Sequence, residues 1–270
     1  MKVLFFGDIV GKPGRQAIKK ILPELKEKFE PDLILANGEN LAHGKGISQE
    51  SLKEAIDAGI NWITTGNHVF TGKGAVEILE DKNWPVLRPA NWTAKTPGRG
   101  FEIISLRSKK ILLINLIGRI FMREQLNDPF SCVNEILEDY SLSKEVGKEM
   151  VSAIIVDWHA EATSEKVVMG WHLDGRVSAV LGTHTHVATD DARILPQGTA
   201  YISDVGMVGP RDSVLGVDKD IIIKRFLMQM PYKMELAPGP VLVNAVLITL
   251  DDKTGLAQNI EKIKEVVEVN

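Results

Sequence analysis

Short apolar segments of this chain repeatedly end at residues that can bind metal ions, and this pattern restricts the fold more than any other feature. Lys2–Gly7, Asp32–Ala36 and Asn61–Thr65 predict buried strands. The segments 13–29 and Ser48–Ala58 predict helices, the second of which begins at a residue type that favours the N-cap. This alternation of strands and helices indicates a mostly parallel sheet.

The second half of the chain predicts further strands. Gly100–Leu106 and Lys109–Ile117 flank a polar turn and predict an antiparallel hairpin, which we expect to belong to a second sheet. Ser152–Asp157 and Val177–Leu181 predict buried strands, with a helix near Ser164–Leu173 between them.

The last part of the chain has a less definite pattern. The segments 241–250 and 259–269 are compatible with strands or with a final helix. Asp204–Arg211 contains too many glycines for a plain strand and predicts a loop that packs against the site, near a dimer partner. We find no internal repeat and no long linker, so we predict a single domain spanning 1–270.

The composition is typical of a soluble globular protein, with 44% hydrophobic and 25% charged residues. The net charge of −4 excludes a globally basic footprint for nucleic acid, although a local basic patch around a phosphate site is compatible with it. The single cysteine, Cys132, cannot form an intrachain disulfide and is expected to be a buried helical thiol. No apolar run is long enough for a signal peptide or a membrane span. We therefore expect a cytoplasmic protein with no membrane partner.

The residues that can bind metals lie at the ends of five predicted strands. In an open parallel sheet, ligands bind at the carboxyl ends of the strands. We therefore expect these side chains to meet at one edge. The candidate ligands are Asp8, Glu39, Asn40, Asn67, His159, His184 and His186.

These side chains form a chemically consistent set. Imidazole, carboxylate and amide oxygen suit first-row metals such as Mn, Fe, Zn or Co, and the lack of thiolates excludes a cysteine-type zinc site. Seven candidates exceed the needs of one tetrahedral ion, which favours a pair of ions that share a bridging carboxylate. An extended backbone at His184–His186 would place both imidazoles on one face.

Other features have simpler interpretations. Gly7–Pro13 differs from a phosphate-binding P-loop in its spacing and in having Pro13 where Ser or Thr is required, so we expect a turn that exposes Asp8. His43, in a glycine-rich loop, is either a surface histidine or a contact to the substrate. Trp158 is expected to support His159 from the core. Solvated or structural roles are expected for Arg119, Arg123, Arg211 and His172.

Several motifs resemble the calcineurin-like metallophosphoesterases. These are Gly7-Asp8, Gly66-Asn67-His68 and the segment Gly182–His186. That superfamily usually opens with Asp-x-His, and this chain has Asp8-Ile9-Val10 instead. It also has Asn37-Gly38-Glu39-Asn40 where Gly-Asp-x-x-Asp is usual. In both of these motifs the chain resembles the YmdB-like branch of the superfamily, which uses a bridging Glu with an adjacent Asn. The resemblance covers nearly the whole chain.

The resemblance implies a four-layer αββα sandwich with a dinuclear metal site at the carboxyl ends of the strands. One ion is expected on Asp8, Glu39, Asn40 and His186, and the other on Glu39, Asn67, His159 and His184, so that Glu39 bridges. Fe or Mn is the first expectation for the metals, with Zn, Co and Mg as alternatives. His68 stays unligated and faces the substrate.

The implied activity is that of a phosphodiesterase that hydrolyses 2′,3′-cyclic and 3′,5′-cyclic nucleotides. A hydroxide bridging the metals would attack phosphorus, and His68 would protonate the leaving group as general acid. One alternative is a single-metal or amide-bond hydrolase. Another is a regulatory protein that keeps the fold with weak activity and binds RNA or protein. A homo-oligomer is compatible with all three interpretations.

Overall fold

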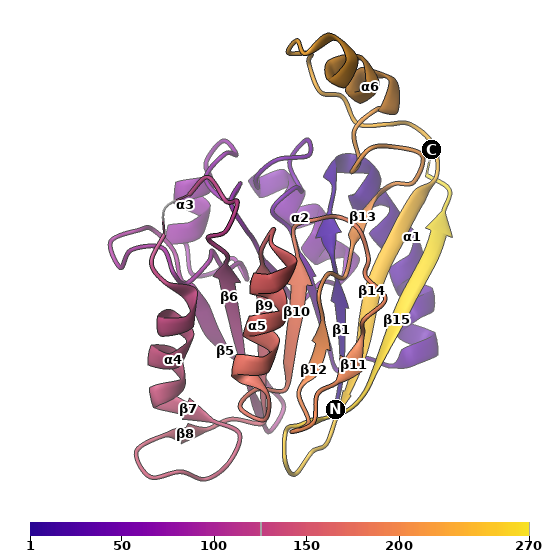
Figure 1. Cartoon of the computed structure of the whole chain (residues 1–270). Helices are drawn as coiled ribbons and strands as arrows, with labels where there is room; N and C mark the ends of the chain where they lie inside the picture. Colours follow the sequence, from indigo (N-terminus) through magenta and orange to yellow (C-terminus); the bar gives the residue numbers. More distant parts are fainter. Residues whose placement is uncertain (125, 270) are drawn as a thin grey trace.

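The computed structural model describes residues 1–124 and 126–269 (Figure 1). The helices are α1 (Gly11–Phe29), α2 (Gln49–Ala58), α3 (Ala75–Glu80), α4 (Pro129–Asp139), α5 (Thr163–Leu173) and α6 (Lys219–Met228). The strands are β1 (Lys2–Phe6), β2 (Asp8–Ile9), β3 (Leu33–Asn37), β4 (Trp62–Thr64), β5 (Phe101–Leu106), β6 (Lys109–Ile117), β7 (Tyr140–Ser141), β8 (Glu149–Met150), β9 (Ala153–His159), β10 (Ala179–Thr183), β11 (Arg193–Ile194), β12 (Ala200–Ile202), β13 (Met207–Pro210), β14 (Val241–Leu250) and β15 (Ala257–Val267).

Two large sheets contain most of the described strands. Sheet A has the order β2-β13-β14-β1-β3-β4, with β15 also paired to β14. Sheet B has the order β11-β12-β10-β9-β6-β5. β1, β3 and β4 run parallel in sheet A, and β6, β9, β10 and β12 run parallel in sheet B.

The alternation of side chains along β1 shows how sheet A is covered. Val3 and Phe5 belong to a core that also contains residues of sheet B. Leu4 and Phe6 point to the opposite face and belong to a core with residues of α1 and α2. All four side chains are fully buried, as expected for a strand with both faces covered.

Sheet B is covered in the same way. Ile111 and Leu113 of β6 face the core between the two sheets, and Leu112 and Ile114 face a core that includes residues of α4 and α5. The layers are therefore helices, sheet A, sheet B and helices (Figure 1). The four-layer αββα sandwich predicted from the resemblance is confirmed.

Most predicted elements are present, with shifted ends. β1 stops at Phe6, and Asp8 begins β2 and does not end the first strand. β9 continues through His159, which the sequence placed after the strand. α1 begins at Gly11, before Pro13. α2 has the expected N-cap, because Ser48 accepts a hydrogen bond from the backbone N–H of Ser51 in a capping box.

The C-terminal segments form strands. β14 and β15 pair antiparallel from Val241↔Val267 onward, so the alternative of a final helix at 259–269 is wrong. The expectation of a loop over the whole of Asp204–Arg211 is also wrong in part. Met207–Pro210 forms β13, which pairs with β2 and β14, because sheet hydrogen bonds outweigh the weak strand propensity of Gly209.

Two further features concern the surface. α6 stands away from the sheets (Figure 1), and none of its residues is buried. Cys132 lies in α4 as expected, but it is half-buried and not fully buried, and burial raises the pKa of its thiol to about 11. No helix in the described part of the chain has the length and apolar character needed to cross a membrane.

Candidate metal centre

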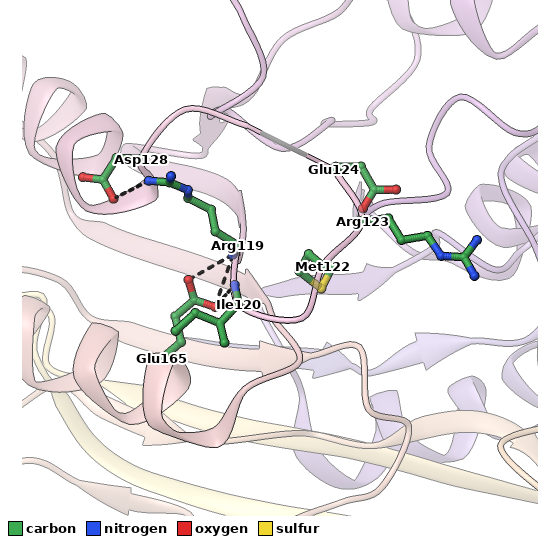
Figure 2. Close-up of a pocket in the computed structure, with 7 residues that line it drawn as sticks. All are labelled: Arg119, Ile120, Met122, Arg123, Glu124, Asp128 and Glu165. Atoms are coloured by element: carbon green, nitrogen blue, oxygen red, sulfur yellow. Dashed lines mark hydrogen bonds and ion pairs between the residues drawn. The ribbon is translucent and has the colours of Figure 1, made fainter.

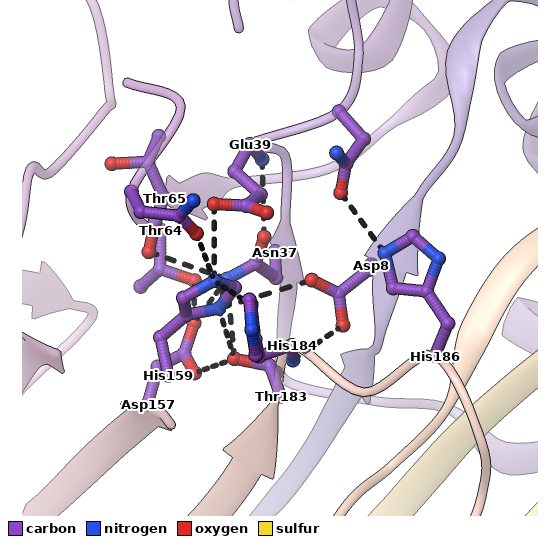
Figure 3. A network of polar contacts seen from close by, with 12 residues as sticks. Asp8, Asn37, Glu39, Thr64, Thr65, Asp157, His159, Thr183, His184 and His186 are labelled. Carbon is purple, nitrogen blue, oxygen red and sulfur yellow. Dashed lines mark hydrogen bonds and ion pairs between the residues drawn. The ribbon is translucent and has the colours of Figure 1, made fainter. Parts of the chain in front are cut away.

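The structure brings the predicted ligands together at one edge of the two sheets. Asp8 begins β2, Glu39 and Asn40 follow β3, and Asn67 follows β4. His159 ends β9, and the segment with His184 and His186 follows β10. Figure 3 shows the side chains of Asp8, Glu39, His159, His184 and His186 pointing toward one another from these separate elements. The prediction that the carboxyl ends of parallel strands would bring these residues to one place is confirmed.

His159 is the centre of the first half of the cluster and is fully buried. Its Nε2 lies 3.0 Å from Glu39 Oε2, 3.0 Å from His184 Nδ1 and 3.2 Å from Asn67 Oδ1. The ligand atoms of Glu39, His159 and His184 all lie within 4.8 Å of one another, which is close enough for one ion to bind all three.

A hydrogen-bond chain fixes the orientation of the His159 ring. Thr183 Oγ1 donates to Asp157 Oδ1 at 2.7 Å, so it accepts from His159 Nδ1 at 2.8 Å. In the neutral ring the proton therefore lies on Nδ1, and the Nε2 lone pair faces Glu39 and Asn67. The lone pairs of His159 Nε2, Glu39 Oε2 and Asn67 Oδ1 then face one another, with too few protons to form hydrogen bonds between them. A divalent cation fits this donor set, and the carboxylate–threonine–histidine chain is the kind of support that metal-bound histidines usually have.

Asp157 also connects the two sheets behind the centre. Its Oδ2 accepts hydrogen bonds from Asn37 Nδ2 at 2.8 Å and from the hydroxyl of Thr64. Asn37 and Thr64 belong to sheet A, whereas Asp157 and Thr183 belong to sheet B. Burial raises the pKa of Asp157, and His159 and these hydrogen bonds oppose that rise.

The second half of the cluster contains Asp8, Asn40 and His186. His186 Nδ1 donates to the carbonyl of Leu215 at 3.1 Å, so in the neutral ring the Nε2 lone pair faces Asn40 Oδ1 at 3.2 Å. Asn40 Nδ2 donates to Gly44 O at 3.0 Å, which holds its oxygen toward His186. Two acceptors that face each other again fit a cation between them.

Asp8 supplies an oxygen without a hydrogen bond to this half. Its Oδ2 accepts from the backbone N–H of His184 at 3.1 Å, whereas the buried Oδ1 has no hydrogen-bond partner among the described residues and lies 3.8 Å from His159 Nδ1. A buried carboxylate oxygen without a partner is costly unless a cation binds it. Burial raises the pKa of Asp8 to about 6, although His186 and His159 oppose this effect.

The charges in the cluster favour a cation at its centre. Burial alone would lower the pKa of His159, but Glu39, Asp8 and Asp157 together raise it to about 9. Burial would raise the pKa of Glu39, but His159 lowers it to about 2. These shifts have one cause, because buried carboxylates stabilise positive charge next to them.

The backbone of the His184–His186 segment differs from the expectation. His184 has φ of +102° and His186 has φ of +66°, so the segment is not extended and the two rings do not share one strand face. His184 points to His159, and His186 points to Asn40 (Figure 3). The left-handed backbone therefore places one imidazole in each half of the cluster.

A buried ion pair holds this unusual backbone. Lys166 Nζ lies 3.0 Å from Asp204 Oδ2 and donates to Thr183 O at 2.5 Å. Asp204 Oδ2 accepts from Thr185 N at 3.0 Å, and its Oδ1 accepts from Gly206 N at 2.9 Å. The pair therefore binds the backbone on both sides of His184, where strain is tolerated only if the surroundings fix it.

His68 and His43 lie beside the cluster in different places. The backbone N–H of His68 donates to Glu39 Oε2 at 3.3 Å, and its half-buried side chain lines a cavity with Asn67 and His184. Burial lowers the pKa of His68, and Glu39 is the main group that opposes this effect. His43 is exposed with φ of +53° and lines a neighbouring cavity, not the cavity that His68 lines.

Trp158, Arg119 and Arg211 have structural or surface positions outside the ligand cluster. Trp158 is fully buried and lies in the core beside α5, so its predicted structural role is confirmed. Arg119 and Arg211 form ion pairs with Asp128 and Asp212, in agreement with the predicted structural or solvated roles.

Sequence reasoning assigned no role to five residues that support the ligands, which are Asn37, Asp157, Lys166, Thr183 and Asp204. A signal existed for Asp157, because period-two alternation places it on the same strand face as His159. Lys166 and Asp204 have no such local signal, since their partners are distant in the sequence.

The sequence that carries this geometry matches a known protein family. A family model described as "YmdB-like protein" matches residues 4–263. The chain belongs to this family. The resemblance to the YmdB-like branch, predicted from the motifs, is therefore confirmed.

Three known proteins are similar to this YmdB-like chain in sequence or in structure. A 2′,3′-cyclic-nucleotide 2′-phosphodiesterase of Bacillus subtilis (strain 168) is 44% identical over 263 residues, which cover 97% of this chain and 96% of the relative. The crystal structure of a novel phosphatase from Mycoplasma pneumoniae has a TM-score of 0.90 at 34% identity, covering 99% of this chain and 94% of that one. The calcineurin-like phosphoesterase YfkN from Bacillus subtilis shares the fold, with a TM-score of 0.57 at 12% identity and coverage of 99% and 90%. The predicted enzyme class, a phosphoesterase, is confirmed.

Gly66 offers a test of the ligand geometry. A Cβ at this position would lie 2.2 Å from Glu39 Oε2 and 2.3 Å from His159 Nε2. We expect Gly66→Ala to displace both side chains and to lower the metal content of the purified chain, measured by elemental analysis. Gly147→Ala is the control, because a Cβ there meets nothing within 4 Å and adds only backbone strain. Metal content equal to wild type in Gly66→Ala would contradict the placement of these two ligands.

Lys166→Met tests the buried ion pair, because it leaves the Asp204 carboxylate buried without its partner. We expect the free energy of unfolding, measured in urea, to fall by about 3–5 kcal/mol. The exposed pair between Lys53 and Asp57 gives the control, and Lys53→Met should cost less than about 1 kcal/mol. Lys166→Met/Asp204→Asn should regain part of the loss. Equal losses for Lys166→Met and Lys53→Met would show that the buried pair is not structural.

Proposed function

We propose that this chain is a dinuclear metal-dependent phosphodiesterase that hydrolyses cyclic nucleotides. The observation that carries the proposal is the convergence of two sets of lone pairs, one on His159 Nε2 and one between His186 Nε2 and Asn40 Oδ1. With both imidazole rings neutral, as in a metal-bound histidine, each set lacks the protons that would make it a hydrogen-bond network. Each therefore suits a divalent cation.

The proposed ligand sets follow the two halves of the cluster. One ion is assigned to Asp8, Glu39, Asn40 and His186, and the other to Glu39, Asn67, His159 and His184, with Glu39 as the bridge. The unpartnered Oδ1 of Asp8 supports the first set, and the short distances around His159 Nε2 support the second. Iron or manganese is the proposed metal, since imidazole, carboxylate and amide ligands suit both. When bound, two such ions would supply a nucleophile from water at neutral pH and neutralise charge on the phosphoryl oxygens.

His68 is the proposed general acid. It borders the same cavity as Asn67 and His184 without being one of the assigned ligands. Burial lowers its pKa, but an anionic phosphodiester in the cavity would favour the imidazolium. The ring could then give its proton to the leaving oxygen of the substrate.

Other side chains around the cluster are assigned supporting roles. Thr183 and Asp157 keep the His159 proton on Nδ1, so that Nε2 stays free to bind a cation. Lys45 and Arg123 border the cavity and can neutralise a bound phosphate. His43 lies beside Lys45 in the neighbouring cavity and remains a candidate for contact with a larger substrate.

The relative from Bacillus subtilis supports the choice of substrate, since its name gives a 2′,3′-cyclic nucleotide as substrate and it matches 97% of this chain. We include 3′,5′-cyclic nucleotides in the proposal, because the same ligands can bind either phosphodiester. We further propose that residues 1–270 act as a single domain in the cytoplasm, and that a homo-oligomer forms.

A substrate panel tests the proposal. We expect anaerobically purified chain to contain two metal ions per molecule by elemental analysis. It should hydrolyse 2′,3′-cyclic nucleotides and bis-p-nitrophenyl phosphate, lose activity on chelation and regain it with Fe²⁺ or Mn²⁺. Hydrolysis of an amide substrate alone would indicate a different enzyme class. Tight RNA or protein binding without metal-dependent turnover would indicate a regulatory protein.

The role of His68 has its own test. We expect His68→Ala to keep its metal content but to lose most turnover, because the substitution removes a proton donor and no ligand. His172→Ala is the control, since this histidine lies on α5 and contacts Asn134. Elemental analysis and steady-state kinetics give the two measurements. An equal loss of metal in His68→Ala would make His68 a ligand, and unchanged turnover would remove its role as acid.

A further inference from the structure

The cavity beside the metal centre has room for more than a phosphate group. Its volume is about 500 Å³, within the range of about 300–1,000 Å³ that is usual for small-molecule sites. Asn67, His68 and His184 line the part that belongs to the cluster. Phe121 and Arg123 come from the loop that follows β6 and also line this cavity.

The loop after β6 is held in place by groups that are themselves fixed. The buried Glu165 of α5 accepts from the backbone N–H of Arg119 at 3.0 Å and of Ile120 at 3.3 Å (Figure 2). Gly118 N donates to the carbonyl of His159 at 2.9 Å, which joins the loop directly to the strand that carries a proposed ligand. The position of the first part of this loop, directly before Phe121, is therefore set by the fold.

Phe121 is unusual in both exposure and conformation. Its side chain is 84% exposed, although a large aromatic group gains free energy by leaving water. Its φ is +64°, a left-handed conformation that is uncommon for a bulky residue and marks strain or function. The loop thus holds an apolar ring at the edge of a cavity where no described residue covers it.

The polar groups of the same cavity indicate what kind of molecule the ring would contact. Arg119 points to Asp128, whereas Arg123 extends from the other side of the loop (Figure 2). Lys45 and Arg123 can attract an anion. Glu124 also borders the cavity, and its buried Oε2 has no hydrogen-bond partner in the described part of the chain, so it offers an acceptor for N–H groups.

We propose that Phe121 is the stacking platform for the nucleobase of the substrate, with the phosphate at the metal centre and the base against the exposed ring. Aromatic side chains bind bases of any sequence by stacking, and a heterocycle with N–H groups also suits the free acceptor of Glu124. This inference rests on the proposed function and adds a specificity-determining residue to it. Phe121 acts through binding of the base and takes no part in the chemical step.

The test compares a substrate that has a base with one that lacks it. The full chain with its metals is assayed on 2′,3′-cyclic AMP and on glycerol 1,2-cyclic phosphate, which has the same five-membered phosphodiester ring. We expect Phe121→Ala to lower kcat/KM for 2′,3′-cyclic AMP about tenfold, mainly through KM. The value for the glycerol substrate should not change. Phe121→Trp should retain the preference for the nucleotide, because indole also stacks.

Phe226→Ala is the control, since Phe226 is 78% exposed on α6 and does not line this cavity. It should leave both substrates unaffected. An equal loss for both substrates in Phe121→Ala would show that the residue only maintains the loop, and no loss for either would show that the base does not contact it. Both results overturn the inference. Failure of the proposed function is a separate result, in which the wild-type chain with metals hydrolyses neither substrate.

Discussion

The buried carboxylate of Asp157 is the interaction on which the rest of the site depends. It accepts hydrogen bonds from Asn37 and Thr64 of sheet A and from Thr183 of sheet B. Burying a carboxylate is costly unless its oxygens accept hydrogen bonds, and three donors from three strands supply them. The same contacts join the sheets where their parallel strands end and fix the His159 ring through Thr183. The link between the two sheets at this edge and the orientation of a proposed ligand thus have one physical cause.

The ligand cluster in front of Asp157 differs from this support, because several of its acceptor atoms have no donor. Behind the ligands both oxygens of Asp157 accept hydrogen bonds, whereas in front of them acceptors are in excess, as at His159 Nε2 and at Asp8 Oδ1. Natural cores rarely leave buried polar atoms unpartnered, and such exceptions mark functional sites. The surrounding fold offsets this local cost, since both sheet faces are covered by apolar cores. A hydrogen-bonded support therefore carries a site whose excess of acceptors suits a cation.

The sequence predicted much of this arrangement for reasons that are local. Asp8, Glu39 and His159 could be placed at a common edge because each ends or closely follows a short apolar strand, and parallel strands end together. The backbone at His184–His186 was predicted wrongly, because its left-handed conformation depends on Lys166 and Asp204, which reach it from α5 and from the segment before β13. Gly209 likewise joined a strand that its own propensity disfavours.

The sequence by itself determined which short segments form most of the strands, the chemical types of the ligands and the family resemblance, since these follow from alternation and from short motifs. Only the tertiary structure decided which nitrogen of His159 and of His186 faces the cluster, because a carbonyl or hydroxyl distant in the chain fixes each ring. It also decided that Phe121 stands exposed beside His68 in one cavity. A local pattern sets what a segment can form, but hydrogen bonds and burial between distant segments set where each atom points.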